Sequence, residues 1–294
     1  MQEFVQNLVN ALALGGTYAL LALGLALIFS ILRLINFAHG ELVTMTGYVL
    51  FFAMGAGIAT PIVVVLGILA AGVASTAMER VFFRPFRGAD PTTMLLTTFG
   101  LSIAIQVLFQ VLISPRAKGV NIDLWVPNVI QIGGIQIGGL QVVSLVASGC
   151  ALAALTVFIR GTNLGLSMRA AAENLPVARL MGVKANRVIA VAFLASGLLA
   201  GLAGVLWVSQ RATVDPLMSL VPLLKAFVAA IVGGLGSPVG AAGAAFLLGA
   251  LEVGFQSYLP TGLLEYRDAL VWVVVIGVLL FRPNGLFQPV GEKV

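Results

Sequence analysis

The sequence predicts an all-α polytopic membrane protein with about eight to ten transmembrane or re-entrant helices, in a single transmembrane domain over residues 1–294. Three observations predict this class. Of the 294 residues, 60% are hydrophobic and 9% are charged, whereas a soluble domain is about 45–50% apolar and about 25% charged. Mean hydropathy is +1.08. Apolar runs also recur along the whole chain, as lipid requires of spanning helices. Soluble, disordered and collagen-like proteins are excluded.

Nine apolar segments are expected to be membrane helices. They are Leu8–Leu32, Leu42–Ile58, Pro61–Met78, Met94–Ile113, Leu140–Ile159, Val188–Val208, Val221–Leu235, Val239–Tyr258 and Leu263–Phe281. A spanning helix needs about 20 residues, so Val221–Leu235 is expected to be a half-helix or a re-entrant element. The first segment is longer than a signal-peptide core and lacks its basic flank, so it is expected to be a retained membrane helix.

The basic residues predict the orientation of the helices. Of the 16 Lys and Arg, 11 fall in one set of connections and four in the other, while Lys225 lies inside an apolar segment. Because Lys and Arg collect in cytoplasmic loops, the N-terminus is expected outside and the C-terminus in the cytoplasm. The net charge of +5 has the same cause. No long basic run is present, so nucleic acid is not an expected partner.

Two connections are long. The outer one, 114–139, contains alternating residues around Gly133-Gly134, which is a hairpin pattern. It is either a docking surface for an external partner or a loop over the helix ends. The inner one, 160–187, begins with turn and cap residues over Thr162–Arg169. Short helical stretches are then expected at Arg169–Asn174 and Val177–Met181. They would insert into a groove on another protein or lie on lipid headgroups.

Small residues recur at the spacing that lets membrane helices approach closely. The pairs are Gly197-x-x-x-Gly201 and Gly236-x-x-x-Gly240. Packing within one subunit is favoured over an interface between subunits.

Enzyme and cofactor motifs are missing from the sequence. It has no G-x-x-x-x-G-K-[ST], so the chain is not expected to hydrolyse nucleotides by a P-loop. Cys150 is the one cysteine and His39 the one histidine. They support neither a metal cluster nor an intrachain disulfide, so no catalytic residue, metal or cofactor is expected.

Polar groups within apolar segments carry the functional signal, because charge in lipid is costly and usually functional. The densest patch runs from Asn36 through His39 to Glu41, with Thr44 and Thr46 one helical turn on. One interpretation is a gate or pathway lining. The other is a cap that joins two helices, with His39 donating to Glu41 or to a backbone carbonyl.

Two further charges lie in apolar segments. Lys225 is expected to extend outward from a helix end, the alternative being a position on a cavity. Glu252 lies in the middle of its segment, where it is either paired inside the bundle or exposed to an aqueous path. Both are therefore gate or pathway candidates, and Glu252 alone gives thin support to a carrier driven by protons or sodium.

Several motifs follow one another in a recognisable order along the chain. They are Gly15-Gly16-Thr17-Tyr18-Ala19-Leu20, Leu32-Arg33-Leu34-Ile35-Asn36-Phe37-Ala38-His39-Gly40-Glu41, Thr162 to Ala170, Ser196 to Val205, Gly233 to Gly240 and Phe281 to Phe287. In this order they resemble one bacterial permease family, the high-affinity branched-chain amino acid ABC importers. The chain is most similar to the shorter, Liv-type permease subunit, and the resemblance runs nearly end to end.

The resemblance implies a set of partners in the bacterial inner membrane. They are a second homologous permease subunit, two ABC ATPase subunits that bind ATP, and a periplasmic or lipid-anchored substrate-binding protein. The inner loop would then couple to an ATPase. The residues that match the coupling loop are Arg169, Ala170, Glu173, Asn174, Ala178 and Gly182. Many ABC importers carry Glu-Ala-Ala-x-x-x-Gly in this loop, whereas Pro176 stands here in place of the Glu.

The implied function is import of Leu, Ile and Val by alternating access, with this chain supplying half of the pathway and no ATPase site of its own. The same importer type carrying urea, short amides or other neutral or aromatic amino acids is the nearest alternative. A secondary transporter or channel is a second alternative. An intramembrane enzyme or assembly factor is disfavoured because catalytic clusters are absent from the sequence.

Overall fold

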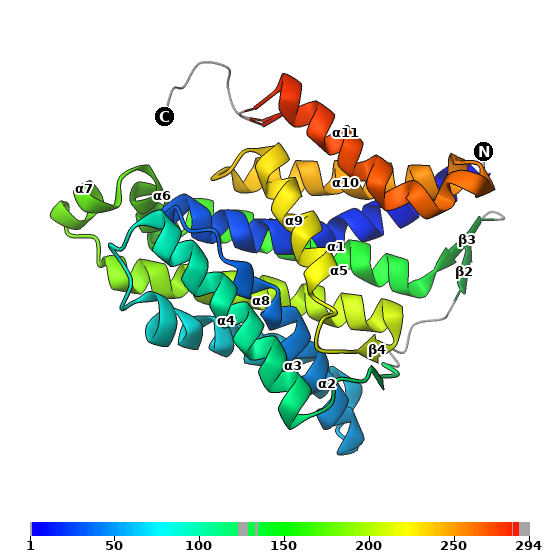
Figure 1. Cartoon of the computed structure of the whole chain (residues 1–294), viewed down its shortest axis with the longest axis horizontal. Coiled ribbons are helices and arrows are strands. Elements are labelled where there is room, and N and C mark those ends of the chain that lie inside the picture. Colours follow the sequence, from blue (N-terminus) through cyan, green and yellow to red (C-terminus); the bar gives the residue numbers. More distant parts are fainter. Residues whose placement is uncertain (1, 123–128, 133–134, 284, 288–294) are drawn as a thin grey trace.

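The computed structural model describes residues 2–122, 129–132, 135–283 and 285–287, and it is almost entirely helical (Figure 1). Each of the nine apolar segments corresponds to a helix, which confirms the all-α fold class. These helices are α1 (Gln2–Leu32), α2 (Glu41–Gly55), α3 (Thr60–Met78), α4 (Pro91–Leu112), α5 (Gly139–Gly161), α8 (Ala185–Arg211), α9 (Leu220–Gly233), α10 (Pro238–Tyr258) and α11 (Arg267–Phe281).

Shorter helical elements fill the connections. They are the 3-10 turns η1 (Phe37–His39) and η3 (Thr261–Tyr266), the π-helical turn η2 (Glu79–Phe83), α6 (Asn163–Glu173) and α7 (Leu175–Leu180). The turns η1 and η2 extend the apolar helices α2 and α3.

Within the described residues, seven helical segments are long and apolar enough to cross a membrane. They are Glu3–Leu32, Phe37–Gly55, Thr60–Phe83, Pro91–Leu112, Gly139–Gly161, Ala185–Arg211 and Pro238–Tyr258. The chain is thus a multi-pass membrane protein. Helix α9 has only 14 residues and rises about 21 Å, less than the roughly 30 Å of the hydrocarbon core. The short length expected for Val221–Leu235 is confirmed.

Local capping sets several helix starts. The Asp90 carboxylate accepts a hydrogen bond from the Thr93 N–H ahead of α4, and Ser237 accepts one from the Gly240 N–H ahead of α10. Each cap is followed by a proline, which suits the first turn because its missing N–H needs no partner there. The expected start of the first helix at Leu8 was wrong, because the polar residues before it continue the same helix from Gln2.

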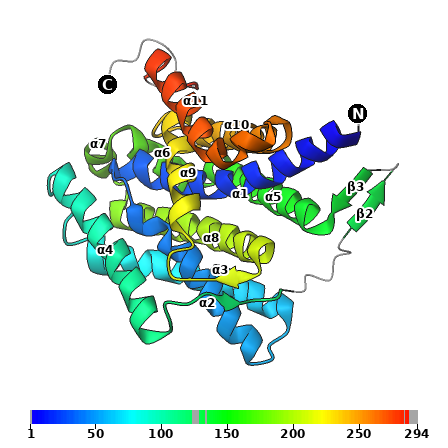
Figure 2. The same ribbon diagram turned by 45° about the vertical axis from the view of Figure 1, so that its right-hand side comes forward.

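Helix α1 forms the centre of the bundle. In the most apolar 18-residue stretch of α1, 83% of the residues are buried inside the protein, whereas the share is 17% for the same stretch of α4 and of α5. It packs against α5, α8, α9 and α10, while α3 packs along α8 (Figure 1, Figure 2). Helices α4 and α5 therefore present most of their surface to the surroundings.

Glycines mark the closest helix contacts. A Cβ on Gly197 of α8 would lie 2.5 Å from the Ser75 Cβ of α3, and one on Gly201 would lie 2.8 Å from the Ile68 Cα. In the second pair, Gly240 packs against Gly233 across the α9–α10 turn. Gly197 and Gly201 thus serve packing within the subunit, as favoured from their spacing. The helix-packing interpretation of the second pair was wrong, because Gly236 lies in the turn before α10 with a φ of +96°.

The two long connections lie at opposite ends of the molecule (Figure 1). Strands β2 (Val129–Ile132) and β3 (Ile135–Gly138) pair as an antiparallel hairpin at the end that holds the N-terminus. Near it, β1 (Lys118–Gly119) pairs with β4 (Thr213–Val214), which joins the loop after α4 to the loop after α8. Helices α6 and α7 occupy the other end.

Candidate functional site

The chain between α1 and α2 leaves the helical conformation at the exposed Arg33 and then turns back into the bundle. Arg33 has a φ of +53°, and residues 33–36 form neither helix nor strand before η1 begins. From there the chain passes through Gly40 directly into α2. Backbone outside a helix is tolerated at membrane depth only where protein buries it or it lines a cavity.

His39 shows how deep this break lies. The Ser196 hydroxyl donates to the Gly24 carbonyl at 2.9 Å and lies 3.3 Å from His39 Nδ1. Gly24 is about 12 Å from the end of α1, and Ser196 is about 16 Å from the start of α8, at 1.5 Å per residue. η1 and the first turn of α2 therefore pack against the interior of α1 and α8 rather than at their ends, well inside these two membrane helices.

Glu41 is hydrogen-bonded through one carboxylate oxygen. Its Oε1 accepts from Gln106 Nε2 at 2.7 Å, from Ser102 Oγ at 2.8 Å and from Ser219 Oγ at 3.4 Å. Glu41 is 1% exposed. The hydrogen bond considered between His39 and Glu41 is not formed, because the His39 ring packs against α1 and α8 while the Glu41 side chain turns toward α4.

Several buried oxygens around the break have no partner. Within the part of the chain that the structure describes, Asn36 Oδ1, Glu41 Oε2, Thr44 Oγ1 and Tyr48 Oη are buried without a hydrogen bond. Buried polar groups are normally bonded, and each exception needs an explanation. Three of these four residues were gate or pathway candidates from the sequence.

Lys225 and Glu252 form a buried ion pair. Lys225 Nζ lies 2.6 Å from Glu252 Oε1 and 3.4 Å from Asp268 Oδ1. The Tyr18 hydroxyl donates to Glu252 Oε2 at 3.1 Å. The expectation that Lys225 extends outward was wrong, because its partner lies on α10, 27 residues further along the chain. The pair joins α9 to α10, and Tyr18 adds α1.

Arg87 and Glu79 form a second pair at the end of η2. The Arg87 guanidinium donates to the Glu79 carboxylate and, at 2.6 Å, to the Asn186 side-chain oxygen at the start of α8. Burial lowers the pKa of Arg87, and the neighbouring Glu79 carboxylate acts in the opposite direction. The pair fixes the loop after η2 against α8.

Metal-binding side chains are sparse. His39 is fully buried, and Cys150 is exposed on α5. Among the described residues, no group of three or more His, Cys, Asp or Glu side chains could hold a metal ion.

The loop with the coupling candidates forms two short helices. The Thr162 hydroxyl accepts from the Gly165 N–H and starts α6 at Asn163, so the expectation of turn residues up to Arg169 was wrong. The Asn174 side chain accepts from the Val177 N–H and starts α7. Gly182 ends the unit with a φ of +87°, a conformation that glycine adopts without strain.

The six coupling candidates do not share one surface. Arg169, Ala170, Glu173 and Asn174 are exposed on α6 or at its end, whereas Ala178 is buried at 4% exposure. Two apolar side chains of the loop are strongly exposed: Leu180 at 86% and Met181 at 81%. They lie at the end of α7, which protrudes from the molecule (Figure 1).

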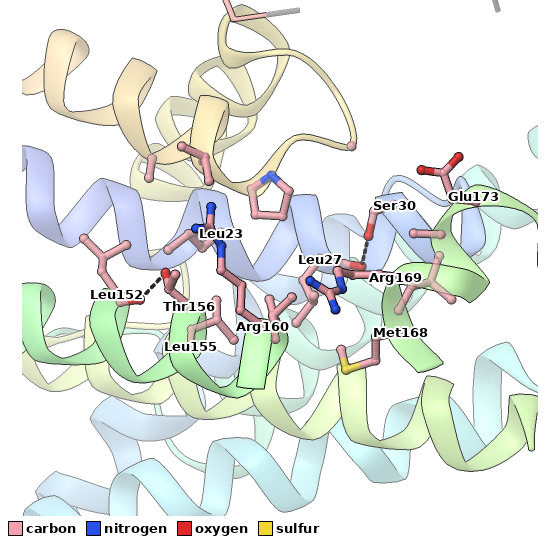
Figure 3. Close-up of a pocket in the computed structure, with 17 residues that line it drawn as sticks. Leu23, Leu27, Ser30, Leu152, Leu155, Thr156, Arg160, Met168, Arg169 and Glu173 are labelled. Atoms are coloured by element: carbon pink, nitrogen blue, oxygen red, sulfur yellow. Dashed lines mark hydrogen bonds between the residues drawn. The ribbon is translucent and has the colours of Figure 1, made fainter. Parts of the chain in front are cut away.

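A cavity of about 410 Å³ lies at the base of this loop. Its walls come from α1, α5, α6 and the start of α10 (Figure 3). Leucines such as Leu23, Leu27 and Leu155 form the apolar part, and Arg160, Arg169 and Glu173 add charge. The cavity thus lies between α6 and the central helix α1.

Comparison with known proteins identifies the family. A family model described as the permease component of the branched-chain amino acid transport system matches residues 7–281. The chain belongs to this family.

Curated relatives cover nearly the full length of this family member. It is 34% identical to the high-affinity branched-chain amino acid transport system permease protein BraD of Pseudomonas aeruginosa, over 99% of this chain and 98% of the relative. It is 35% identical to the permease protein LivH of Escherichia coli and 34% to LivH of Salmonella typhimurium, with the same coverage. No solved structure matches the chain.

Sequence reasoning missed the residues of α4 that face the break in this permease. Thr98 donates to the Ile35 carbonyl at 3.1 Å, and Ser102 and Gln106 donate to Glu41. The signal was present, because these three polar residues recur every fourth position along a mainly apolar helix and so share one face. Sequence reasoning also missed the exposed tip of α7. The two neighbouring apolar residues Leu180 and Met181 in a polar loop could have indicated it.

Proposed function

We propose that the chain is the permease subunit of an ATP-driven importer that moves branched-chain amino acids across the bacterial inner membrane by alternating access. The observation that carries the proposal is identity of 34–35% over 99% of the chain with proteins named as such permeases. The chain supplies half of the pathway. It has no ATPase site or cofactor of its own, and it binds no nucleic acid.

The importer contains four kinds of subunit. This permease pairs with a second, homologous permease. Each of the two permeases binds one ABC ATPase subunit, and the two ATPase subunits hold the ATP. A periplasmic or lipid-anchored binding protein delivers cargo from outside. The N-terminus and the β2–β3 hairpin lie outside, while α6, α7 and the C-terminus lie in the cytoplasm. The 11 Lys and Arg in one set of connections support this orientation.

Coupling to the ATPase runs through the α6–α7 loop, with the tip of α7 making the central contact. Leu180 and Met181 are more than four-fifths exposed and apolar, as suits insertion of a helix end into a groove. Arg169, Ala170, Glu173 and Asn174 flank the contact, while Ala178 and Gly182 shape the loop.

The pathway candidates divide into two groups. Asn36, Glu41 and Thr44 line the pathway, which the unpaired oxygens at the break between α1 and α2 support. Lys225 and Glu252 hold α9 against α10, which their 2.6 Å ion pair supports. His39 holds the break against α1 and α8.

Copurification tests the assembly. The tagged permease, expressed with its neighbouring genes and solubilised in mild detergent, is expected to retain two ATPases and a second permease. Leu180→Glu is expected to release the ATPase bound to this subunit but not the second permease. Leu263→Glu, an equally drastic change of an exposed leucine at the other end of the molecule, is expected to release neither.

Two results would overturn the proposal. Purification of the chain alone or only with itself, in several detergents, would leave a secondary transporter or a channel. An uptake panel in which urea, short amides or aromatic amino acids enter, but Leu, Ile and Val do not, would keep the importer and change its cargo.

A further inference from the structure

Glu41 is the one buried acid without a cation in the described part of the chain. Three carboxylates are buried there: Glu41, Glu79 and Glu252. Glu79 is paired with Arg87, and Glu252 with Lys225. Among the described residues, none that is positively charged pairs with Glu41. An unpaired charge at this depth is costly, so this side chain needs an explanation that the other two do not.

Helix N-termini and hydrogen bonds offset part of the cost of burying the Glu41 charge, without supplying a cation. Glu41 is the first residue of α2, and it accepts a hydrogen bond from Ser219, the residue before α9. It thus lies at the N-termini of two helices, whose dipoles stabilise a negative charge. The three hydrogen bonds on Oε1 act in the same direction, while Oε2 has none.

A stripe of unpaired oxygens continues from Glu41 along α2. Glu41, Thr44 and Tyr48 share one helix face by their spacing, and each contributes a buried oxygen without a hydrogen bond. Glu41 bonds to α4, and the Tyr48 ring stacks on Phe109 of α4 with centroids 4.7 Å apart. We name this contact the α2–α4 seam. It is about 10 Å long at 1.5 Å per residue, enough to hold one amino acid.

The position of the seam and the exposure of α4 suit a transport site. The seam begins at the break in the chain, well inside the membrane helices α1 and α8, and transporters place substrate beside such interrupted segments. Helix α4 is at the edge of the bundle (Figure 2), and only 17% of its most apolar window is buried. Movement of α4 away from α2 would open the seam without disturbing the central helices.

We propose that the α2–α4 seam binds the ammonium group of an amino acid cargo, with Glu41 as its counter-charge and the Thr44 and Tyr48 hydroxyls as further hydrogen-bond acceptors. An ammonium group brings one positive charge and three donors, which matches one unpaired carboxylate oxygen and two unpaired hydroxyls. The inference rests on the proposed function and names the part of the cargo that this subunit recognises.

The test is uptake of labelled leucine by the complete importer in proteoliposomes. Glu41→Gln keeps the shape and removes the charge, and it is expected to lower kcat/KM by roughly 10- to 100-fold, as for a lost hydrogen bond to a charged group. Thr44→Val and Tyr48→Phe are each expected to lower it by about three- to tenfold. The basal ATPase rate and the subunit composition are measured on every variant.

Thr46→Val is the matched control. Thr46 lies on the same helix, but its hydroxyl already donates to the Leu42 carbonyl at 2.8 Å. Its removal is expected to leave uptake unchanged. If the unpaired oxygens were only a structural defect, Thr44→Val and Tyr48→Phe would leave uptake unchanged too, because neither removes a hydrogen bond within the chain. These two variants decide the matter even if Glu41→Gln fails to assemble.

The outcomes separate the two proposals. Leucine uptake by the wild type, with every variant equal to Thr46→Val, overturns the ammonium site and leaves the proposed function standing. Wild-type uptake of a different amino acid overturns the branched-chain cargo, and the same variants then test the seam with that amino acid. Uptake of urea but of no cargo with an ammonium group overturns both.

Discussion

At the scale of the residue, Lys225 is expected to stabilise the bundle only because Glu252 faces it. Lys225→Met leaves the Glu252 carboxylate buried without its nearest cation, and loss of one partner of a buried pair costs about 3–5 kcal/mol. A clearly lower unfolding temperature in detergent is the expected result, measured by the fluorescence of the three tryptophans.

The double variant Lys225→Met with Glu252→Gln is the control for this loss. It removes both charges, so it is expected to regain more than half of the stability lost in Lys225→Met. Additive losses in the two single variants would show that the charges do not interact, despite the 2.6 Å between Nζ and Oε1.

Single residues were the least predictable part of the site. The sequence marks Lys225, Glu252 and Glu41 as unusual, because each is a charge in an apolar segment. It does not show their partners, since Lys225 meets a residue on α10 and Glu41 meets Ser102, 61 positions later. Hydrogen-bond partners at such separations depend on how the helices pack. Packing also turned His39 toward Ser196 rather than Glu41.

At the scale of the element, the contact between α3 and α8 depends on glycine. A side chain on Gly197 would have to displace Ser75 and the Ala71 carbonyl, because its Cβ would lie 2.5 and 2.7 Å from their atoms. Gly197→Ala is therefore expected to cost about 1–3 kcal/mol of stability, as overpacking does. The unfolding temperature of the purified protein measures it.

Gly149→Ala provides the comparison for this change. Gly149 is also inside a membrane helix, but a Cβ there would meet nothing within 4 Å. The same substitution is expected to leave the unfolding temperature unchanged or slightly higher, because alanine favours helix. Equal losses in the two variants would mean that helix propensity, rather than the contact with α3, sets the effect.

Elements were predicted well where hydropathy determines them and less well where single side chains do. All nine apolar segments are helices, because lipid leaves a long apolar segment few other structures. The start of α6 was misplaced, since the hydroxyl of Thr162 sets it. The depth of the break between α1 and α2 was also missed, because Arg33 to Gly40 reads only as a loop until Gly24 and Ser196 show where it lies.

At the scale of the whole molecule, the proposed orientation predicts labelling from opposite sides. In a Cys150→Ser background, Arg116→Cys lies in the connection near the β2–β3 hairpin, and Met181→Cys lies at the tip of α7. A membrane-impermeant maleimide added to intact spheroplasts is expected to label the first and spare the second. Inside-out vesicles, with the permease expressed without its partners, are expected to show the reverse.

This labelling experiment has a clear contrary result. Labelling of Met181→Cys from outside in intact spheroplasts would invert the orientation, and the distribution of Lys and Arg would then need another cause. Labelling of both positions from one side would contradict the fold itself, because α7 and the β2–β3 hairpin lie at opposite ends of the molecule (Figure 1).

The central place of α1 has a consequence for biosynthesis. Tyr18 of α1 contacts Glu252 of α10, 234 residues later. At roughly 5–20 residues per second, the first helix leaves the ribosome about 10 to 50 s before its main neighbour exists. During that interval its small-residue face, including Gly15, has only lipid or the insertion machinery against it. The helix that is made first is therefore the last to be fully enclosed, and a nascent chain released before α10 should be a substrate for membrane proteolysis.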